Sequence, residues 1–168
     1  MKKFLNNSMF VAASFVLIRI YLSYMWLTNA ENKLIYDFSI GTMLETEVNS
    51  GTLPSWWAGF MKIFVLPNTG LFEALVTIGE LCVGVAILLG VFTRFSALMG
   101  AIMNFSFFMT FQAALDIQML VLHLLIVLVA ANAGRIGLDP YIKKFTRNKL
   151  RPFLKPKQSK RKGKLAWH

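Results

Sequence analysis

Long apolar stretches separated by short polar connections dominate the chain. A helix of about 20 apolar residues crosses the hydrocarbon core of a bilayer, and backbone in lipid must satisfy its own hydrogen bonds. Four stretches meet this requirement, with approximate spans 9–28, 71–91, 95–113 and 115–133. The pattern predicts an all-α fold, a polytopic membrane four-helix bundle over residues 1–142 followed by a tail at 143–168.

Each span carries one strongly polar residue near its midpoint. These residues are Arg19, Glu80, Asn104 and His123. Each lies about one residue from the centre of its span, or roughly 1.5 Å of helix rise, so all four are expected at nearly the same depth. An ionised side chain there is costly unless it is paired or hydrated. We therefore expect a buried polar site in which Arg19 and Glu80 form an ion pair, with Asn104 or His123 one hydrogen bond away.

Helical spacing turns these residues toward one another. Polar residues in spanning helices face the bundle interior, and Gly100 lies one turn before Asn104, where a small residue permits close helix contact. Glu73 lies two turns before Glu80, near the outer rim, and is expected to serve as a helix-start residue or an entrance charge. The spacing of these polar and small residues along each helix therefore predicts that the polar site lies between the helices.

The outer segment 29–70 is the least regular part of the chain. Residues 36–53 combine glycines, asparagine and acids, and are expected to form an exposed loop. Pro54 and Pro67 then bracket an apolar stretch with two adjacent tryptophans, which is too short to span. Tryptophan prefers the headgroup region, so a short interfacial helix is expected here. It would act either as an anchor that positions the loop or as a lid over an outward-facing cavity.

Composition and charge support a membrane protein and set its orientation. The chain is 56% hydrophobic and 15% charged, with a mean hydropathy of +0.56, which excludes a soluble domain of this size. Residues 135–168 hold twelve Lys/Arg and one acid, whereas residues 1–134 hold six Lys/Arg and seven acids. The positive-inside rule places this end, Lys2, Lys3 and Arg94 in the cytoplasm. Both termini are thus expected to be cytoplasmic, and nucleic acid is not an expected partner.

Few residues can carry metal or redox chemistry. The single cysteine, Cys82, can form no internal disulfide and is expected to be a buried packing residue. The two histidines are His123 and His168, which lies at the end of the tail. They provide no pair for haem and no cluster for zinc. We expect no metal and no covalently bound cofactor, so electrons would come from a diffusible membrane carrier or a partner subunit.

Several motifs together resemble a known family. The run from Phe72 to Arg94 carries the strongest likeness. The further matches are Arg19 and Trp26 with Lys33 downstream, Trp56-Trp57, Gly100 to Asn104, and Asn132 to Asp139. Over residues 14–142 the chain resembles the DoxX/DoxD family of small four-span membrane proteins. Where many relatives carry an asparagine before the fourth span, this chain has Asp116.

The resemblance implies a bacterial or archaeal cell membrane and a relationship to the membrane subunit of a thiosulfate:quinone oxidoreductase. On this interpretation Arg19, Asn104 and His123 would donate hydrogen bonds to a membrane quinone, and Glu80 and His123 would exchange protons with it. The catalytic candidates are Arg19, Glu80 and His123. The expected partners are the lipid bilayer and a soluble or membrane oxidoreductase, with a homo-oligomer left open.

Other interpretations remain open. In one of them the polar residues are purely structural: Arg19 and Glu80 form an ion pair that holds two helices together, and Asn104 and His123 form hydrogen bonds between helices. The function would be a non-enzymatic membrane scaffold that recruits a partner through the tail and the outer loop. A small-solute or proton pathway is a third alternative.

Overall fold

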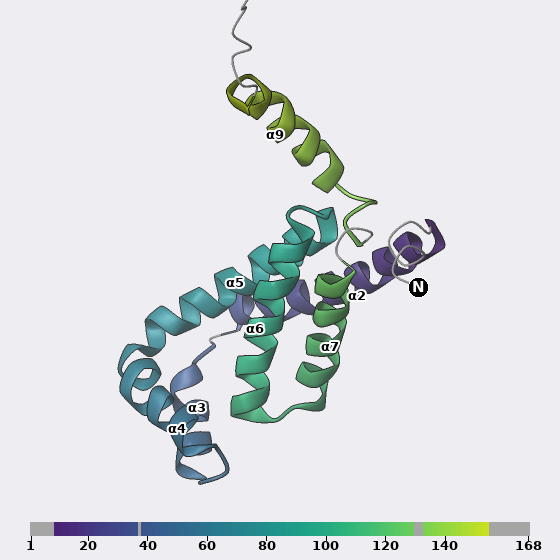
Figure 1. Cartoon of the computed structure of the whole chain (residues 1–168). Helices are drawn as coiled ribbons and strands as arrows, with labels where there is room; N and C mark the ends of the chain where they lie inside the picture. The colour runs from purple at the N-terminus through teal and green to yellow at the C-terminus, as the bar shows by residue number, and fades with distance from the viewer. Residues whose placement is uncertain (1–8, 37, 130–132, 155–168) are drawn as a thin grey trace, which may run out of the picture.

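The structure, a computed structural model, describes residues 9–36, 38–129 and 133–154, with side chains up to residue 147. Within these ranges all regular elements are helical, which confirms the all-α prediction (Figure 1). The elements are α2 (Met9–Ile35), α3 (Ile40–Asn49), α4 (Ser55–Phe60), the π-helix η1 (Met61–Val65), the 3-10 helix η2 (Leu66–Asn68), α5 (Thr69–Leu89), α6 (Thr93–Phe111), α7 (Ala114–Leu128) and α9 (Asp139–Leu154). The predictions that rest on Lys2, Lys3, Asn132, His168 and the end of the tail lie outside the described residues.

Four helices, α2, α5, α6 and α7, form a bundle. Helix α2 packs along α5, and α6 packs along α7 and against α5 (Figure 1). Leu22, Trp26, Ile87 and Ile126 are fully buried between them. Two helical segments, Met9–Ile35 and Ser55–Leu89, are long and apolar enough to cross a membrane, and Ala114–Leu128 is a shorter apolar helix.

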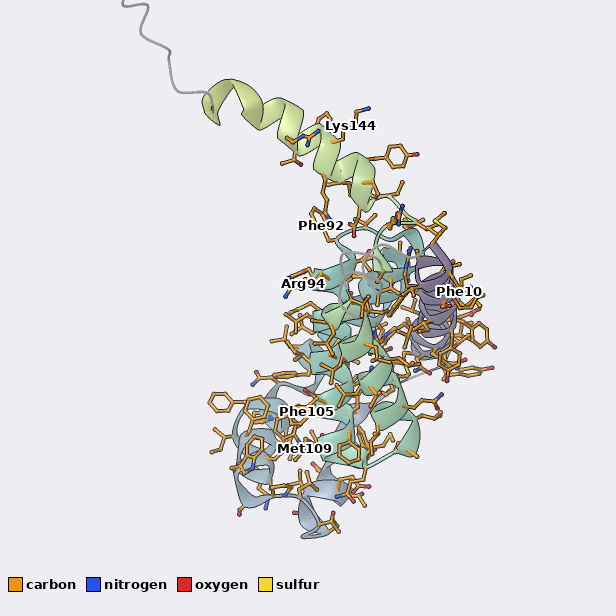
Figure 2. All side chains as sticks on the ribbon, turned by 45° about the vertical axis from the view of Figure 1, so that its right-hand side comes forward. Phe10, Phe92, Arg94, Phe105, Met109 and Lys144 are labelled. Carbon is orange, nitrogen blue, oxygen red and sulfur yellow. The ribbon has the colours of Figure 1, made fainter. Side chains whose placement is uncertain are left out.

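The surface of the bundle is apolar, and several polar side chains are buried within its largely apolar interior. Figure 2 shows Phe10, Phe92 and Phe105 projecting outward, whereas Glu80 and His123 are at most 1% exposed. Such a distribution is expected for helices surrounded by lipid, because polar side chains avoid hydrocarbon.

The expectation that Cys82 is buried was wrong. Cys82 is exposed, because α5 turns Glu80, Val83, Gly84 and Ile87 toward the bundle. At 3.6 residues per turn, a position two residues after Glu80 lies on the opposite side of the helix.

The prediction of a loop at 36–53 was also wrong, because residues Ile40–Asn49 form α3. Ile40, Leu44 and Val48 recur every fourth residue and are buried in a second apolar core under the outer segment. The Glu73 carboxylate accepts a hydrogen bond from the backbone N–H of Ile40 at 2.7 Å, which satisfies a free donor at the start of α3. Glu73 is therefore a helix-start residue, but for α3 rather than for its own helix.

The short helix expected after Pro54 is present as α4, and it continues without a break into α5. The helical run Ser55–Leu89 has 35 residues, or roughly 50 Å at 1.5 Å per residue, so it exceeds a bilayer core of about 30 Å. It bends at the outer segment (Figure 1), where η1 and η2 surround Pro67. Proline lacks the N–H that an α-helix needs at this position, which accounts for the irregular turns.

At the opposite end, α9 projects away from the bundle (Figure 1). Tyr141, Lys143, Lys144 and Phe145 on this helix are exposed, and Figure 2 shows Lys144 far from the bundle. The expected boundary between membrane domain and tail, at residue 142, falls inside α9.

Candidate functional site

The four polar residues expected at one depth are all buried, as predicted, but they form two separate groups. Arg19, Glu80, Asn104 and His123 are each at most 3% exposed. The expected Arg19–Glu80 ion pair is wrong, because Glu80 pairs with Lys33 instead. Asn104 and His123 contact each other.

Arg19 binds backbone carbonyls where α5 ends. Its Nε donates to Ile87 O at 2.8 Å and one terminal nitrogen donates to Leu88 O at 2.8 Å. The other terminal nitrogen donates to Ala133 O and Ile136 O. The last carbonyls of a helix lack intrahelical partners and carry partial negative charge, so Arg19 stabilises the end of α5.

The depth of Arg19 was misjudged because α2 is longer than expected. It extends to Ile35, which moves the helix midpoint to Leu22, three residues beyond Arg19. That is about 4.5 Å of rise. The long side chain of Arg19 then reaches away from the midpoint of α2, to the C-terminal end of α5. Arg19 thus contacts the end of α5 rather than the other three polar residues.

The turn between α5 and α6 is also held in place by hydrogen bonds from the start of α9. Gly90 ends α5 with φ 67°, and an added Cβ would overlap the Arg19 guanidinium. The backbone N–H groups of Leu138 and Asp139 donate to Leu89 O and Gly90 O. The Asp139 carboxylate also accepts from the N–H of Thr93, the first residue of α6, at 3.2 Å. We call this region, with Arg19, Gly90, Thr93 and Asp139, the Arg19 end.

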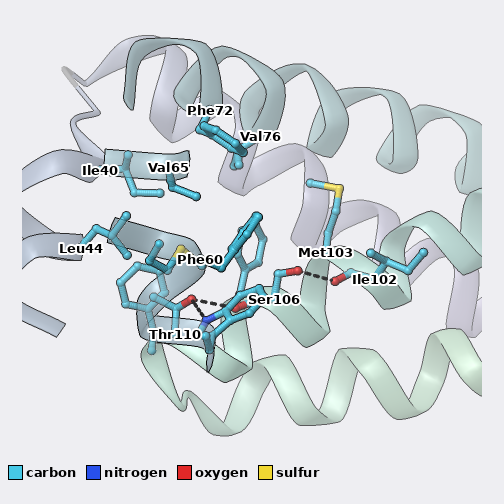
Figure 3. Close-up of a pocket in the computed structure, with 14 residues that line it drawn as sticks. Ile40, Leu44, Phe60, Val65, Phe72, Val76, Ile102, Met103, Ser106 and Thr110 are labelled. Carbon is cyan, nitrogen blue, oxygen red and sulfur yellow. Dashed lines mark hydrogen bonds between the residues drawn. The ribbon is translucent and has the colours of Figure 1, made fainter. Parts of the chain in front are cut away.

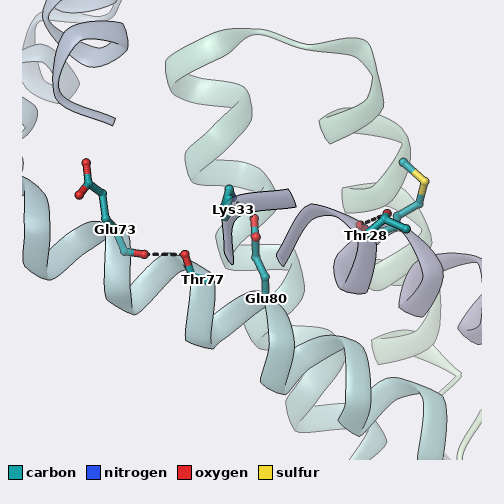
Figure 4. A network of polar contacts seen from close by, with 6 residues as sticks. Thr28, Lys33, Glu73, Thr77 and Glu80 are labelled. Carbon is teal, nitrogen blue, oxygen red and sulfur yellow. Dashed lines mark hydrogen bonds and ion pairs between the residues drawn. The ribbon is translucent and has the colours of Figure 1, made fainter. Parts of the chain in front are cut away.

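A different set of polar groups lies toward the other end of the bundle. Figure 4 shows Lys33 meeting Glu80, with Nζ and Oε1 2.5 Å apart. The second oxygen of Glu80, Oε2, is buried and has no hydrogen-bond partner among the residues that the structure describes. Lys33 is 17% exposed, and its Nζ lies 4.8 Å and 5.4 Å from the ring centres of Phe38 and Phe107.

Glu80 and Lys33 belong to the wall of a cavity of about 290 Å³, which we call the polar pocket. It extends from the C-terminal end of α2 and the N-terminal end of α7 to Glu80 and Asn104, which lie near the middle of α5 and α6. Its polar lining residues are Trp26, Asn29, Lys33, Glu80, Asn104 and Asp116. Sequence reasoning missed Lys33 as a site residue because the expected first span ended at residue 28. The feature of the sequence that could have identified Lys33 is its position seven residues after Trp26, which places both residues on one face of the helix.

His123 lies behind this pocket and uses both ring nitrogens within the protein. Trp26 Nε1 donates to Nε2 at 3.1 Å, so Nε2 accepts and the hydrogen of the neutral ring is on Nδ1. Nδ1 lies 2.7 Å from Met119 O and 3.2 Å from Asn104 Nδ2. His123 therefore positions Trp26, which lines the pocket, and its ring lies beside the Asn104 amide.

The predicted close contact at Gly100 is confirmed. An added Cβ at Gly100 would overlap Nε2 of the His123 ring. This glycine therefore allows α6 and α7 to approach with the imidazole between them.

An apolar groove adjoins the polar pocket. It has a volume of about 360 Å³ and lies between the outer helical segment and α5 and α6 (Figure 3). Four residues line both spaces: Ile40, Val76, Phe107 and Phe111. We call this space the apolar groove.

The pocket offers a defined chemistry. Lys33 is a cationic donor, Glu80 and Asp116 supply carboxylates, and Asn104 supplies an amide. No group of three His, Cys, Asp or Glu residues within the described ranges lies close enough to hold a metal ion. The arrangement suits a small organic group with hydrogen-bonding oxygens.

Comparison with known proteins identifies the family. The DoxX family matches residues 14–113, which include Arg19, Lys33, Glu80 and Asn104 but not Asp116 or His123. No curated protein and no solved structure matches the chain. DoxX membership and the apolar helices indicate an integral membrane protein. Because the match covers more than half of its length, the chain belongs to the DoxX family.

Proposed function

We propose that this protein is a four-span, multi-pass protein of a bacterial or archaeal cell membrane, and that it binds a membrane quinone as a subunit of an oxidoreductase. The quinone ring occupies the polar pocket. The two parts of this proposal, topology and ligand, rest on different features of the molecule.

The apolar exterior and the charge distribution support the topology. Outward-facing residues on all four bundle helices are large and apolar, including Ile20, Ile78, Phe105 and Val121. An even number of crossings brings the start of α2 and the start of α9 to the same side. The basic residues of α9 lie at the Arg19 end, where the positive-inside rule places the cytoplasm. The polar pocket then faces the outer side.

The observation that carries the ligand proposal is the Glu80 carboxylate. Its Oε2 is buried without a partner, although a buried unpaired acceptor costs about 1–3 kcal/mol or more. A hydroxyl group of a hydroquinone would satisfy this oxygen. Lys33 and Asn104, on the same pocket wall, would donate to a quinone carbonyl.

Reduction of a quinone to its hydroquinone consumes two electrons and two protons. In this proposal the electrons come from a partner oxidoreductase, and Glu80 and Asp116 exchange protons with the two ring oxygens. His123 is a positioning residue, because both of its nitrogens already bond within the protein. Arg19 acts on the fold rather than on the ligand.

One observation favours a second function, recruitment of a partner without chemistry. Helix α9 presents exposed Tyr141, Lys143, Lys144 and Phe145 away from the bundle. The outer segment is less suited to recruitment, because α3 and α4 pack onto a core of their own. A scaffold that uses α9 would need neither Glu80 nor the pocket.

Binding of a quinone to the protein in lipid nanodiscs tests the proposal. We expect saturable binding, under reducing conditions, of a hydroquinone that carries a two-unit isoprenoid chain, weakened about tenfold or more by Glu80→Gln, which removes a charged acceptor worth about 1.5–3 kcal/mol. Glu73→Gln is the matched control, because Glu73 lies on the same helix but caps α3. Equal binding by wild type, Glu80→Gln and Glu73→Gln would refute the site, and no saturable binding would refute the ligand.

A further inference from the structure

The apolar groove has no role in the proposed ring site, yet it shares part of its wall with the polar pocket. Ile40 and Val76 face both spaces from the outer segment and from α5, and Phe107 and Phe111 do so from α6. Only these four side chains lie between the two spaces, so a molecule with a polar head in the pocket would need to pass only them to bring an attached chain into the groove.

Every side-chain donor that lines the groove is already used within the protein. Trp57 Nε1 donates to Thr110 Oγ1 at 3.0 Å, and Thr110 Oγ1 donates to Ser106 O at 2.9 Å. Ser106 Oγ donates to Ile102 O at 3.0 Å; these bonds are drawn as dashed lines in Figure 3 beside the labelled Thr110, Ser106 and Ile102. The groove therefore offers its occupant no side-chain hydrogen and selects for hydrocarbon.

The rim of the groove faces the lipid side of the protein. Phe60 and Ile102, which line it, are 39% and 51% exposed. Phe60 also stacks on Trp57, with ring centres 5.4 Å apart, so the rim is built from rigid aromatic groups. A chain that leaves the groove would enter the bilayer rather than water.

We propose that the apolar groove holds the first isoprenoid units of a membrane quinone whose ring lies in the polar pocket. This inference rests on the proposed function and adds to it a determinant of specificity, the length and branching of the side chain. Because a chain outside the groove already lies in the bilayer, the groove binds the first units by close packing against its lining side chains rather than by removing them from water. The protein should therefore discriminate strongly between prenylated and unprenylated rings.

Groove-filling variants test this in the full-length protein in nanodiscs. Ser106→Phe places a ring in the groove, Ser106→Leu is a milder version, and Leu98→Phe on the exposed face of the same helix is the control. The probes are a benzoquinone with no side chain and the same ring with a two-unit isoprenoid chain. Each probe is compared between variants and wild type, so its partition into lipid cancels.

We expect the Kd of the prenylated quinone to rise about tenfold or more in both Ser106 variants, with that of the bare ring and all values for Leu98→Phe unchanged. An unchanged Kd for the prenylated quinone in Ser106→Phe would overturn the groove proposal while leaving the ring site intact. Failure of wild type to bind either probe would instead refute the proposed function. A phospholipid that co-purifies with wild type and is lost in Ser106→Phe would overturn the assignment in favour of an acyl chain.

Discussion

The partner of Glu80 can be tested by comparing two double-mutant cycles. Lys33→Met leaves a carboxylate that is 1% exposed without its 2.5 Å partner, and breaking a buried pair in this way costs about 3–5 kcal/mol. Once Glu80→Gln has removed the charge, Lys33→Met has little left to disrupt. We expect a coupling energy of about 1–3 kcal/mol between Lys33 and Glu80.

Arg19 should behave differently. Arg19→Met removes donors to Ile87 O and Leu88 O, which lie seven and eight residues after Glu80, or roughly 10–12 Å along the helix. Sites this far apart without shared partners add within about 0.5 kcal/mol. We expect Arg19→Met to destabilise strongly alone, and to be additive with Glu80→Gln.

The measurement is the free energy of unfolding in mixed detergent micelles for the wild type, three single variants and two double variants. Glu73→Gln controls for loss of a carboxylate on α5 that lies outside the ion pair. A coupling energy above 1 kcal/mol between Arg19 and Glu80, together with additivity between Lys33 and Glu80, would show that the pairing described for the polar pocket is incorrect.

Two further predictions concern the contact between α6 and α7. Gly100→Ala should destabilise the protein by about 1–3 kcal/mol because its Cβ meets the His123 ring, whereas Gly70→Ala, which meets no atom within 4 Å, should be neutral or slightly stabilising; equal melting temperatures for the two variants would contradict this. His123→Leu should lower the free energy of unfolding by about 1–3 kcal/mol, because the Trp26 N–H loses its acceptor. His123→Gln offers a replacement acceptor, so a Gln variant no more stable than the Leu variant would argue against the Trp26 bond.

Periodicity was sufficient to predict which side chains turn inward. Glu80, Asn104 and His123 interrupt apolar helices, and desolvation of a polar group in lipid is costly enough to fix their orientation. The same reasoning placed Gly100 at a close helix contact, because a glycine within a membrane-spanning helix allows a neighbouring helix to approach closely.

Partners were harder to predict than orientation. The choice of Arg19 for Glu80 followed from span boundaries, and α2 continues seven residues beyond the expected end of the first span, to Ile35. Residues 29–35 include polar and charged positions, so an apolar stretch does not show that the helix continues there. Lys33 was assigned to the outer loop for this reason. Sequence also gives no indication that the acceptors of Arg19 are backbone carbonyls, since every residue has one.

Helix α3 was missed because its composition resembles that of a loop. Thr42, Thr46, Glu45 and Glu47 are exposed or partly exposed, and they obscure the spacing of Ile40, Leu44 and Val48. The apolar partners of α3 come from α4 and η1, so its stability depends on tertiary contacts rather than on local propensity.

The contacts of Arg19 set an order on the assembly of the protein during synthesis. Arg19 belongs to α2, which is synthesised before the other bundle helices, whereas its acceptors lie 68 to 117 residues later in the chain. Two of the four carbonyls, those of Ala133 and Ile136, are made only after α7 is complete. Until then the guanidinium lacks half of its final partners, and loop closure over such separations is slow. We therefore expect the contacts of the Arg19 end to form last in the bundle. A truncated chain that ends before residue 133 would contain all four bundle helices but would lack the Ala133 and Ile136 carbonyls that Arg19 binds.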